Sequence, residues 1–589
     1  MTKGKVTSII SNLITIDVDG PVAQNEICIL VFGEKRLKAE VIRVNGNTAY
    51  AQVFESTRGI KTGMEMEFSG KMLEIELGPG ILSKNFDGLQ NDLDKMEGTF
   101  LVTGEEADPL DGEAIYTFTP LMKQGQQVKA GDWLGTVMEN WIEHKIMVPF
   151  SLQGSFTIKS IVESGDYKIH DTIAVLISKS GNEIPVSMVQ KWPVKIAIPN
   201  YKRKIRPFDI LQTGLRVIDT FNPLTEGGTG FVPGAFGTGK TVLQQAIAKN
   251  GEADIIIIVG CGERANEVVD IFTEFPNLTD PRTGRKLQER TTIVCNTSNM
   301  PVATREASVY VGMTIAEYYR NMGYKVLVLA DSTSRWAQSL REISNRLEEL
   351  PGPDAYPVEL PATIANFYSR AGYVELNNGK TGSVTFIGTI SPAGGNFKEP
   401  VTESTRKVAS CFYALSQKRA DAKRYPAIDP VASYSKYLEY DEFKTFTDEN
   451  IELGWTKYVK KALDIIKLGI EARDYIRILG DDAVPIEYHV RFWRRETFDF
   501  AFIQQDSFDE IDMNSPLERQ KYMLHKILNI CEIDFEFENF QETGEFFKKI
   551  INLLRQMNFV ELESQQFKEY EEKLQQMVED HKTKEVLEV

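Results

Sequence analysis

The stretch that decides the fold is Gly234-Ala-Phe-Gly-Thr-Gly-Lys-Thr241, which matches the phosphate-loop pattern G-x-x-x-x-G-K-[ST]. An extended segment precedes it and apolar residues at helical spacing follow it, which predicts a strand, a loop and a helix. Glycines let the backbone wrap around an anion, and the N-terminus of the helix adds partial positive charge. The alternative is a glycine-rich turn before an ordinary helix. The phosphate-binding residues that this pattern predicts are Gly234, Ala235, Phe236, Gly237, Thr238, Gly239, Lys240, Thr241 and Val242. Among them, Lys240 reaches the outer phosphates and the Thr241 hydroxyl ligates Mg²⁺.

The composition is that of a soluble globular protein with several domains. Of 589 residues, 42% are hydrophobic and 26% are charged, and a chain of this length is expected to form about three to five domains. No stretch approaches the ~18 consecutive apolar residues of a membrane span, and the first ten residues lack a signal-peptide core. We therefore expect a cytoplasmic protein.

Charge and metal-ligating residue types narrow the function classes. The net charge of −17 disfavours general nucleic-acid binding, which needs a basic surface. The five cysteines form no CxxC pair, and the five histidines are scattered. We therefore expect no disulfide framework, no histidine-based metal site and a reducing compartment.

Four regions with different patterns follow one another along the chain. Residues 1–72 carry short β-rich segments that predict a small barrel, and residues 73–193 predict a second β-rich domain. In residues 194–440, continuous apolar runs alternate with helical segments, as in a parallel sheet covered on both faces. Residues 441–589 have a helical pattern. The predicted fold class is therefore multidomain α/β and β, with an N-terminal β-barrel, a β-rich domain, a phosphate-loop α/β domain and a C-terminal helical domain.

Individual elements follow from the same patterns. Ser515-Pro-Leu-Glu518 predicts a capping box with proline at the first helical position, and the charged tail from about residue 565 predicts a solvated helix or frayed end. A linker is expected near residues 192–207. The predicted strands are residues 6–18, 26–31, 37–43, 156–162, 172–177, 255–260 and 325–330, and the predicted helices include residues 306–321 and 458–470.

Three polar residues follow predicted strands, where the ligands of such sheets bind. Asp331 closes an apolar run and is expected to hold Mg²⁺, directly or through water; an ordinary turn residue is the alternative. Glu263 is expected to orient an attacking water, and a solvated loop acid is its alternative. Arg264 is expected to contact phosphate, unless it pairs with Glu263 or Glu267.

Several motifs occur in the order in which one protein family carries them. Over nearly its whole length the chain resembles the catalytic A subunit of V-type and archaeal-type rotary ATPases. Besides the phosphate loop, the motifs that carry this resemblance are Gly262-Glu-Arg-Ala-Asn-Glu267, Asn296-Thr-Ser-Asn-Met-Pro-Val-Ala-Thr-Arg-Glu306, Asp331-Ser-Thr-Ser-Arg-Trp336, Ser391-Pro-Ala-Gly-Gly395, Glu76-Leu-Gly-Pro-Gly80, His144-Lys-Ile-Met-Val-Pro149 and Gln504-Gln-Asp-Ser-Phe508.

The resemblance implies an architecture and an assembly. It implies an N-terminal β-barrel, an inserted bulge domain, a RecA-like nucleotide-binding domain and a C-terminal helical domain. It also implies an A3B3 ring, in which three A subunits alternate with three B subunits around a rotating central stalk. ATP binds at the A–B interfaces, and the B subunit supplies an arginine finger in trans. A peripheral stalk and a membrane sector that moves H⁺ or Na⁺ complete the implied complex, and the ring lies on the cytoplasmic face of the membrane. Mg²⁺ with ATP or ADP is the implied cofactor, and no nucleic acid is implied.

Site residues are carried over by position. The resemblance implies that Lys240, Glu263 and Arg264 are catalytic or contact phosphate, and that Tyr425 and Phe508 frame the adenine ring. From the residues alone, each ring has an alternative as an ordinary core side chain. The departures from the family's usual residues are Ala235 for proline, Ala265 for glycine, Tyr425 for phenylalanine and Asp506-Ser507 for Asn-Ala. None of them removes a catalytic functional group.

Two other functions fit parts of the pattern. A hexameric helicase or protein-export ATPase has a related phosphate-loop core, but the net acidity and the β-rich residues 73–193 disfavour it. A ring subunit that binds nucleotide without cleaving it is disfavoured by the presence of both Lys240 and Glu263.

Overall fold

The computed structural model describes residues 2–32, 35–95, 107–264, 267, 272–273, 275–298 and 300–581. Backbone packing divides the chain into two compact units. Unit 1 comprises Met1–Arg206, Ala253–Ile390 and Asn396–Val408, and unit 2 comprises Pro207–Glu252, Ser391–Gly395 and Ala409–Val589. Both units take residues from the predicted third region, and the four predicted domain bounds stay predictions.

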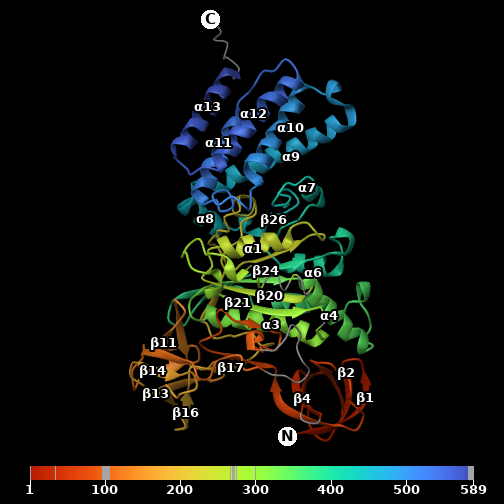
Figure 1. Ribbon diagram of the computed structural model, residues 1–589, viewed down its shortest axis with the longest axis vertical. Coiled ribbons are helices and arrows are strands. Elements are labelled where there is room, and N and C mark those ends of the chain that lie inside the picture. The colour runs from red at the N-terminus through yellow and green to blue at the C-terminus, as the bar shows by residue number, and fades with distance from the viewer. Residues whose placement is uncertain are drawn as a thin grey trace. The chain divides into compact units, whose positions relative to one another are not determined.

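Unit 1 begins with a closed barrel whose strand order is β1-β2-β5-β4-β3-β6 (Figure 1). Its interior is apolar, with Ile14 and Ile16 fully buried. The predicted barrel is confirmed, but the single predicted strand at residues 6–18 is wrong. The chain turns at Ser11, whose φ is 55°, and so makes two strands. The barrel strands are β1 (Lys3–Ile10), β2 (Leu13–Val18), β3 (Glu26–Phe32), β4 (Lys35–Asn45), β5 (Thr48–Val53) and β6 (Glu65–Met72).

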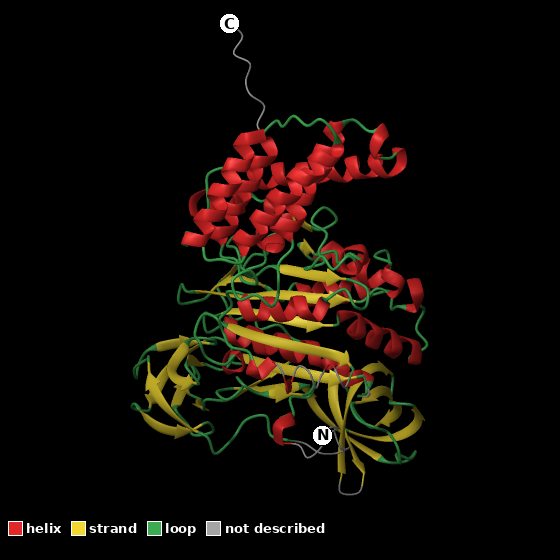
Figure 2. Ribbon diagram, turned by 45° about the horizontal axis from the view of Figure 1, so that its top comes forward, coloured by secondary structure: helices red, strands yellow, loops and turns green. Residues whose placement is uncertain are grey.

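Two four-stranded sheets, with orders β12-β11-β9-β14 and β10-β13-β15-β16, form the predicted β-rich domain (strands yellow in Figure 2). Buried apolar side chains such as Phe118 and Leu176 make up their cores. A ribbon pairs β17 with β7. The strands are β7 (Glu74–Leu77), β9 (Ile115–Pro120), β10 (Gln127–Lys129), β11 (Trp133–Glu139), β12 (Ile142–Met147), β13 (Ser155–Ile161), β14 (Gly165–Lys168), β15 (Ala174–Ile177), β16 (Glu183–Val186) and β17 (Gln190–Pro193).

A mostly parallel sheet and its helices form the rest of unit 1. Strands β21, β20, β22 and β24 are neighbours in that order, and β8 pairs with β21. Ile256 and Leu327 are fully buried, as in a sheet covered on both faces, and α3 packs on β20, β21 and β22 (Figure 1). The strands are β8 (Asn85–Phe86), β18 (Arg203–Ile205), β20 (Ile255–Glu263), β21 (Thr291–Thr297), β22 (Lys325–Asp331), β23 (Gly372–Glu375) and β24 (Thr381–Ile390). The helices are α3 (Val302–Arg320), α4 (Thr333–Arg346), α5 (Leu360–Tyr368) and α6 (Pro400–Val408), with short turns at Leu93–Lys95, Phe275–Asn277, Leu287–Arg290 and Pro353–Ala355.

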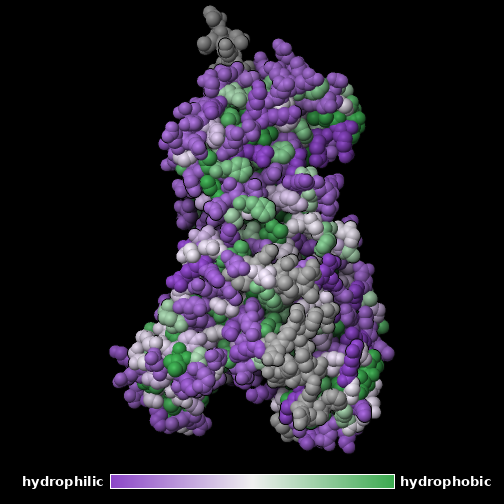
Figure 3. Space-filling view, viewed as in Figure 1, coloured by the Kyte–Doolittle hydropathy of each residue, from purple (hydrophilic) through white to green (hydrophobic). Residues whose placement is uncertain are grey.

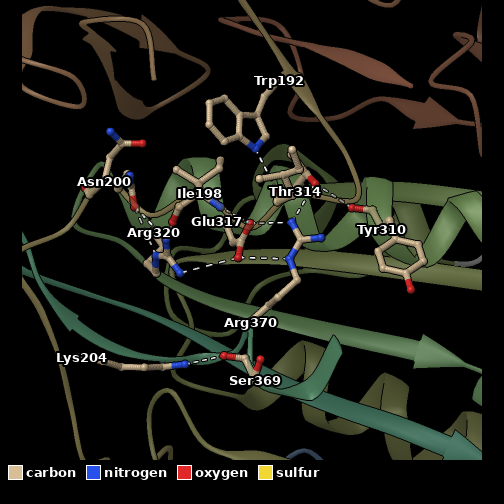
Figure 4. Close-up of polar contacts among 12 residues, drawn as sticks. Trp192, Ile198, Asn200, Lys204, Tyr310, Thr314, Glu317, Arg320, Ser369 and Arg370 are labelled. Atoms are coloured by element: carbon tan, nitrogen blue, oxygen red, sulfur yellow. Dashed lines mark hydrogen bonds and ion pairs between the residues drawn. The ribbon is translucent and has the colours of Figure 1, made fainter. Parts of the chain in front are cut away.

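A buried ionic network binds the predicted linker to α3 (Figure 4). The Glu317 carboxylate, which is fully buried, accepts hydrogen bonds from Arg370 at 2.6 Å and from the Ile198 N–H at 3.1 Å. Arg370 also donates to the Val194 carbonyl at 2.6 Å, and Arg320 donates to the Ile198 carbonyl at 2.8 Å. The linker is therefore fixed on the helix along this stretch.

Unit 2 contains the predicted strand, loop and helix around the phosphate loop. The strand is β19 (Thr229–Pro233), and the helix is α1 (Lys240–Asn250). β19 pairs in parallel with β25 (Cys411–Phe412), which pairs with β26 (Tyr434–Ser435) in antiparallel fashion. The strand and helix that the sequence pattern predicted are confirmed.

Helices make up most of the remainder of unit 2 (red in Figure 2). α9 packs against α10, and α12 packs against α10 and α13. The helices of this part of unit 2 are α7 (Gln417–Asp421), α8 (Asp441–Asn450), α9 (Trp455–Leu479), α10 (Ile486–Phe498), α11 (Leu517–Glu532), α12 (Phe540–Asn558) and α13 (Gln565–His581). Shorter turns are η2 (Val217–Phe221), η6 (Ala393–Gly395), η7 (Lys436–Glu439), η8 (Asp481–Ala483) and η9 (Asp499–Ile503).

The predicted capping box before α11 is wrong. The helix begins after Pro516 without a side-chain cap, and the Ser515 hydroxyl has no hydrogen-bond partner among the described residues. The backbone of Ser515 is instead held on both sides: its N–H donates to the Gly214 carbonyl at 3.0 Å, and its carbonyl accepts from the Gln520 side chain at 2.8 Å. Tertiary bonds therefore replace the local cap.

Hydrophilic residues predominate on the face shown in Figure 3. Among the described helices, none is long and apolar enough to cross a membrane. All five cysteines are buried and free.

Candidate functional site

Two glycines with left-handed backbone shape the phosphate loop. Gly237 has a φ of 80° and Gly239 a φ of 87°, which L side chains rarely adopt. Gly239 is the N-cap of α1, so the helix begins at Lys240. In general, the first N–H groups of an α-helix lie beyond the reach of its own carbonyls. Gly234 is required for another reason, because a Cβ there would lie 2.7 Å from Thr238 Oγ1 and 2.8 Å from Leu415 Cβ. The loop thus has the geometry of an anion site at a helix N-terminus.

The loop also holds its own lysine. Lys240 Nζ donates to the Gly234 carbonyl at 2.7 Å and to the Ala235 carbonyl at 3.2 Å. The Thr238 hydroxyl donates to the same Ala235 carbonyl at 2.7 Å. These bonds place a positive charge against the curve of the loop. Ala235 takes part through its carbonyl, which a proline would also provide, so this departure leaves the contact in place.

The remaining predicted loop residues face outward. Phe236 is 75% exposed and Val242 is 53% exposed. Thr241, the second residue of α1, is exposed as well. Its position in the first turn suits a hydroxyl that ligates a metal bound to phosphate.

Tyr425 lies directly beside the loop. A Cβ placed on Gly239 would lie 3.6 Å from the ring carbon Cε1 of Tyr425, and the ring residue is 39% exposed. Phe508 is 95% exposed. The Gln505 N–H donates to the Tyr425 carbonyl at 2.9 Å and so joins the segments that carry the two rings. Neither ring is buried in a core, so the alternative of an ordinary core side chain does not hold. We call Tyr425 and Phe508 the aromatic wall.

The segment that carries Phe508 is supported by residues that the sequence did not reveal. Arg216 is fully buried, donates to Asp512 Oδ1 at 2.6 Å and donates through its N–H to Gln505 Oε1 at 2.7 Å. The other oxygen of Asp512 accepts from the Asp506 N–H at 2.7 Å, and Asp506 in turn accepts from the Phe508 N–H at 2.9 Å. A buried arginine has no local signature, so only the motif at residues 504–508 pointed to this segment.

The other predicted residues lie in unit 1, at the carboxyl edge of its parallel sheet. Asp331 ends β22, opposite Gly260 on β20, and its carboxylate accepts from the Thr389 hydroxyl. Glu263 ends β20, where its backbone pairs with Thr297; the backbone is the part of Glu263 that the structure describes. Arg264 follows and is exposed, and Ala265 lies outside the described residues. Glu263 and Asp331 therefore end strands, and Arg264 follows one, at the edge where such sheets bind ligands.

Arg305 on α3 is a candidate that the sequence did not single out. It is 8% exposed, and its Cδ lies 2.9 Å from the position of a Cβ on Gly262, next to Glu263. Burial holds its pKa below the ordinary value; Glu342, 3.7 Å away, opposes this shift. The one signal was its place in the motif at residues 296–306. A nearly buried cation at a strand end suits an anionic ligand.

Comparisons with known proteins agree with this geometry. Residues 6–70 match the beta-barrel domain of the ATP synthase alpha/beta family, residues 107–195 match the ATP synthase alpha/beta subunit barrel-sandwich domain, and residues 214–435 match the nucleotide-binding domain of the same family. The V-type ATP synthase alpha chain of Borrelia recurrentis is 46% identical over 583 residues, which cover 98% of this chain and 99% of the relative. The alpha chain of Treponema denticola is 46% identical over 574 residues (97% and 95%), and that of Borreliella burgdorferi is 45% identical over 580 residues (98% and 99%).

The chain belongs to the V-type ATP synthase alpha-chain family. The family, the fold class and the class of ion-translocating ATPase that the motifs predicted are confirmed. The comparisons give no support to a helicase or a protein-export ATPase.

Within this chain, the predicted site residues fall in two groups. Unit 2 brings the phosphate loop and Tyr425 together and joins the Phe508 segment to them. Unit 1 holds Glu263, Arg264 and Asp331. Among the described residues, no group of three or more His, Cys, Asp or Glu side chains could hold a metal ion. The Thr241 hydroxyl is a hard oxygen ligand, of the kind that suits a metal which a bound phosphate also helps to ligate.

Proposed function

We propose that this chain binds and hydrolyses, or synthesises, ATP as the catalytic subunit of a V/A-type rotary ATPase that moves H⁺ or Na⁺. The observation that carries the proposal is the loop at residues 234–241, whose glycines shape an anion site around the Lys240 ammonium. Family membership supports the same conclusion.

The phosphate loop and the strand-end residues have separate roles in this proposal. Lys240 and the N–H groups at the start of α1 bind the phosphates. The Thr241 hydroxyl ligates Mg²⁺, and Asp331 supports the ion through water; the ion supplies neutralising charge to the phosphates. Glu263 orients the attacking water, and Arg264 contacts phosphate.

The aromatic wall binds the other end of the nucleotide. Tyr425 and Phe508 are exposed rings, and stacking between a base and an aromatic ring contributes about 1–3 kcal/mol per base. The position of Tyr425 beside Gly239 supports a base bound next to the phosphate loop.

The proposed partners are the other subunits of the rotary ATPase complex. The chain alternates with B subunits in an A3B3 ring, and each B subunit supplies an arginine finger in trans. Central-stalk subunits, a peripheral stalk and a membrane sector complete the complex, with the ring peripheral to the cytoplasmic face. Because the finger comes from another subunit, the isolated chain is expected to be almost inactive.

The test compares two lysines of α1. Lys240→Ala is expected to lose Mg·ATP affinity by about 10²-fold or more, because it removes a charged donor to the phosphates. Lys249→Ala, in the last turn of the same helix, removes an equal charge and is expected to bind like the wild type. Calorimetry on the full-length chain measures both. Unchanged binding by Lys240→Ala would refute the proposed role of the loop.

A further inference from the structure

We propose that Asp499 is a positioning residue for the base. Its carboxylate binds Arg419 and Arg424, which lie at the two ends of the turn that precedes Tyr425, and so holds Tyr425 beside the phosphate loop. The inference rests on the proposed function, in which Tyr425 stacks on the base. All the residues that carry it belong to unit 2.

Asp499 is a buried anion among arginines. It opens η9, directly after α10, and is 2% exposed. Its Oδ1 lies 2.6 Å from Arg419 NH1, and its Oδ2 binds Arg424 NH1 and lies 3.3 Å from Arg495 NH2. Burial tends to raise the pKa of this carboxyl, but the three positive charges bring the pKa below its ordinary value. Asp499 is therefore a permanent anchor at neutral pH.

The two arginines bound by the separate oxygens of Asp499 lie at the ends of one turn of chain. Arg419 is part of α7, and the Arg424 N–H donates to the Arg419 carbonyl at 2.9 Å. Arg424 is the residue before Tyr425, and its NH2 lies 3.0 Å from Glu496. Its guanidinium also lies 4.5 Å from the centre of the Phe500 ring. A shift of the Asp499 carboxylate would therefore move the turn that ends in Tyr425.

A second, independent anchor fixes the main chain of Tyr425. Its carbonyl accepts from the Gln505 N–H at 2.9 Å, and the side chain of Gln505 donates to the Gly214 carbonyl at 2.9 Å. This anchor sets the distance between the two ring-bearing segments. The Asp499 anchor acts on the preceding turn, so the backbone that carries the ring is held at two points.

An amide cannot replace the carboxylate. Asp499 places each of its two charged oxygens against an arginine, whereas asparagine has one acceptor oxygen and no charge. Asp499→Asn is expected to weaken Mg·ATP binding by the full-length chain about tenfold, because part of the base stacking is lost. Binding of Mg·tripolyphosphate, which has no base, is expected to change less than about twofold. No change for ATP, or an equal loss for both ligands, would overturn the inference.

A double-mutant cycle separates positioning from general loosening. If Asp499 acts through the ring, Asp499→Asn has no further effect on ATP affinity once Tyr425→Ala is present. Additive losses would contradict the inference. Arg424→Lys keeps one charge but not the two-pronged contact, so an intermediate ATP affinity is expected. Arg424→Gln, at a side chain that is 23% exposed, gives the same test if Asp499→Asn does not fold.

Two controls complete the design. Glu571→Gln removes a carboxylate that binds Lys526 between α13 and α11, away from the wall residues in sequence, and is expected to leave both affinities unchanged. Lys240→Ala is expected to lose both ligands. If Lys240→Ala loses neither ligand, the proposed function fails; if it loses both while Asp499→Asn matches the wild type, the inference alone fails.

Discussion

The phosphate loop and the aromatic wall beside it are built in opposite ways. In the loop, Lys240 bonds to a carbonyl six residues away, and Thr238 bonds to one three residues away. In the wall, Arg216 and Asp512 are 296 residues apart, and Arg424 and Asp499 are 75 apart. The loop is a local structure that consecutive residues specify. The wall exists only when distant segments of unit 2 have folded together.

The largest loss of stability is expected from a substitution that removes a long-range contact supporting the aromatic wall and leaves the phosphate loop intact. Arg216→Met leaves Asp512 buried without its partner, and removing one member of a buried ion pair costs about 3–5 kcal/mol. Urea unfolding of the full-length chain measures the loss. Adding Asp512→Leu is expected to restore part of the stability, because the unpaired charge is removed as well. If the single variant is as stable as the wild type, the long-range pair is not what holds the wall.

The buried carboxyl of Asp219 is expected to make the stability of the folded chain depend on pH. Asp219 accepts bonds from Thr213, Gly214 and Gln520, yet burial raises its pKa to about 6 from 3.8. The folded chain thus binds this proton more tightly than the unfolded chain. Its contribution to stability is greatest below the unfolded pKa and falls, by at most about 3 kcal/mol, as pH rises through about 6.

The measurement is the unfolding free energy from about pH 4 to about pH 7. Asp219→Asn, which does not titrate, is expected to be less stable overall, because the amide NH₂ cannot accept a hydrogen bond, but to show a flatter slope. Equal slopes in the two proteins would contradict this prediction.

Two glycine substitutions sharpen the description of the loop. Gly234→Ala places a methyl group 2.7 Å from Thr238 Oγ1 and is expected to cost about 1–3 kcal/mol of stability by overpacking. Gly237→Ala meets no atom within 4 Å and costs only the strain of its positive φ, about 1 kcal/mol. Thermal unfolding ranks the pair. Both variants keep the wall, so the ratio of ATP to tripolyphosphate affinity is expected to stay that of the wild type.

The smallest effect concerns a single bond of the loop. Thr238→Val removes the hydroxyl that donates to the Ala235 carbonyl, and such a bond contributes about 1 kcal/mol. Lys240 still donates to that carbonyl, so tripolyphosphate affinity is expected to fall less than about tenfold. A loss as large as that of Lys240→Ala would mean that the hydroxyl shapes the loop as much as the lysine does.

The sequence predicted the local half of this comparison well. The strand before the loop, the loop and the helix from Lys240 follow from a pattern of consecutive residues, and the apolar runs of β20 and β22 follow from burial on both faces. Asp331 was found because it ends such a run, and Glu263 because it follows one.

The residues that form and support the aromatic wall could not be predicted from consecutive residues in the same way. Tyr425 and Phe508 came from family resemblance, as did the one signal for Arg305, and Arg216, Asp512 and Asp499 had no local signal. The same physics explains the errors. Ser515 has the residue type of a cap, but tertiary bonds to Gly214 and Gln520 fix its backbone instead. Residues 6–18 have the pattern of one strand, but Ser11 turns the chain.

One measurement tests most directly that this chain is the hydrolytic subunit. Glu263→Gln is assembled with the partner subunits, and bound Mg·ATP is followed through a single turnover beside the wild type. The account predicts that ATP still binds but that its cleavage slows about 10²–10⁴-fold, because the group that orients the water is lost. Cleavage at the wild-type rate would contradict it.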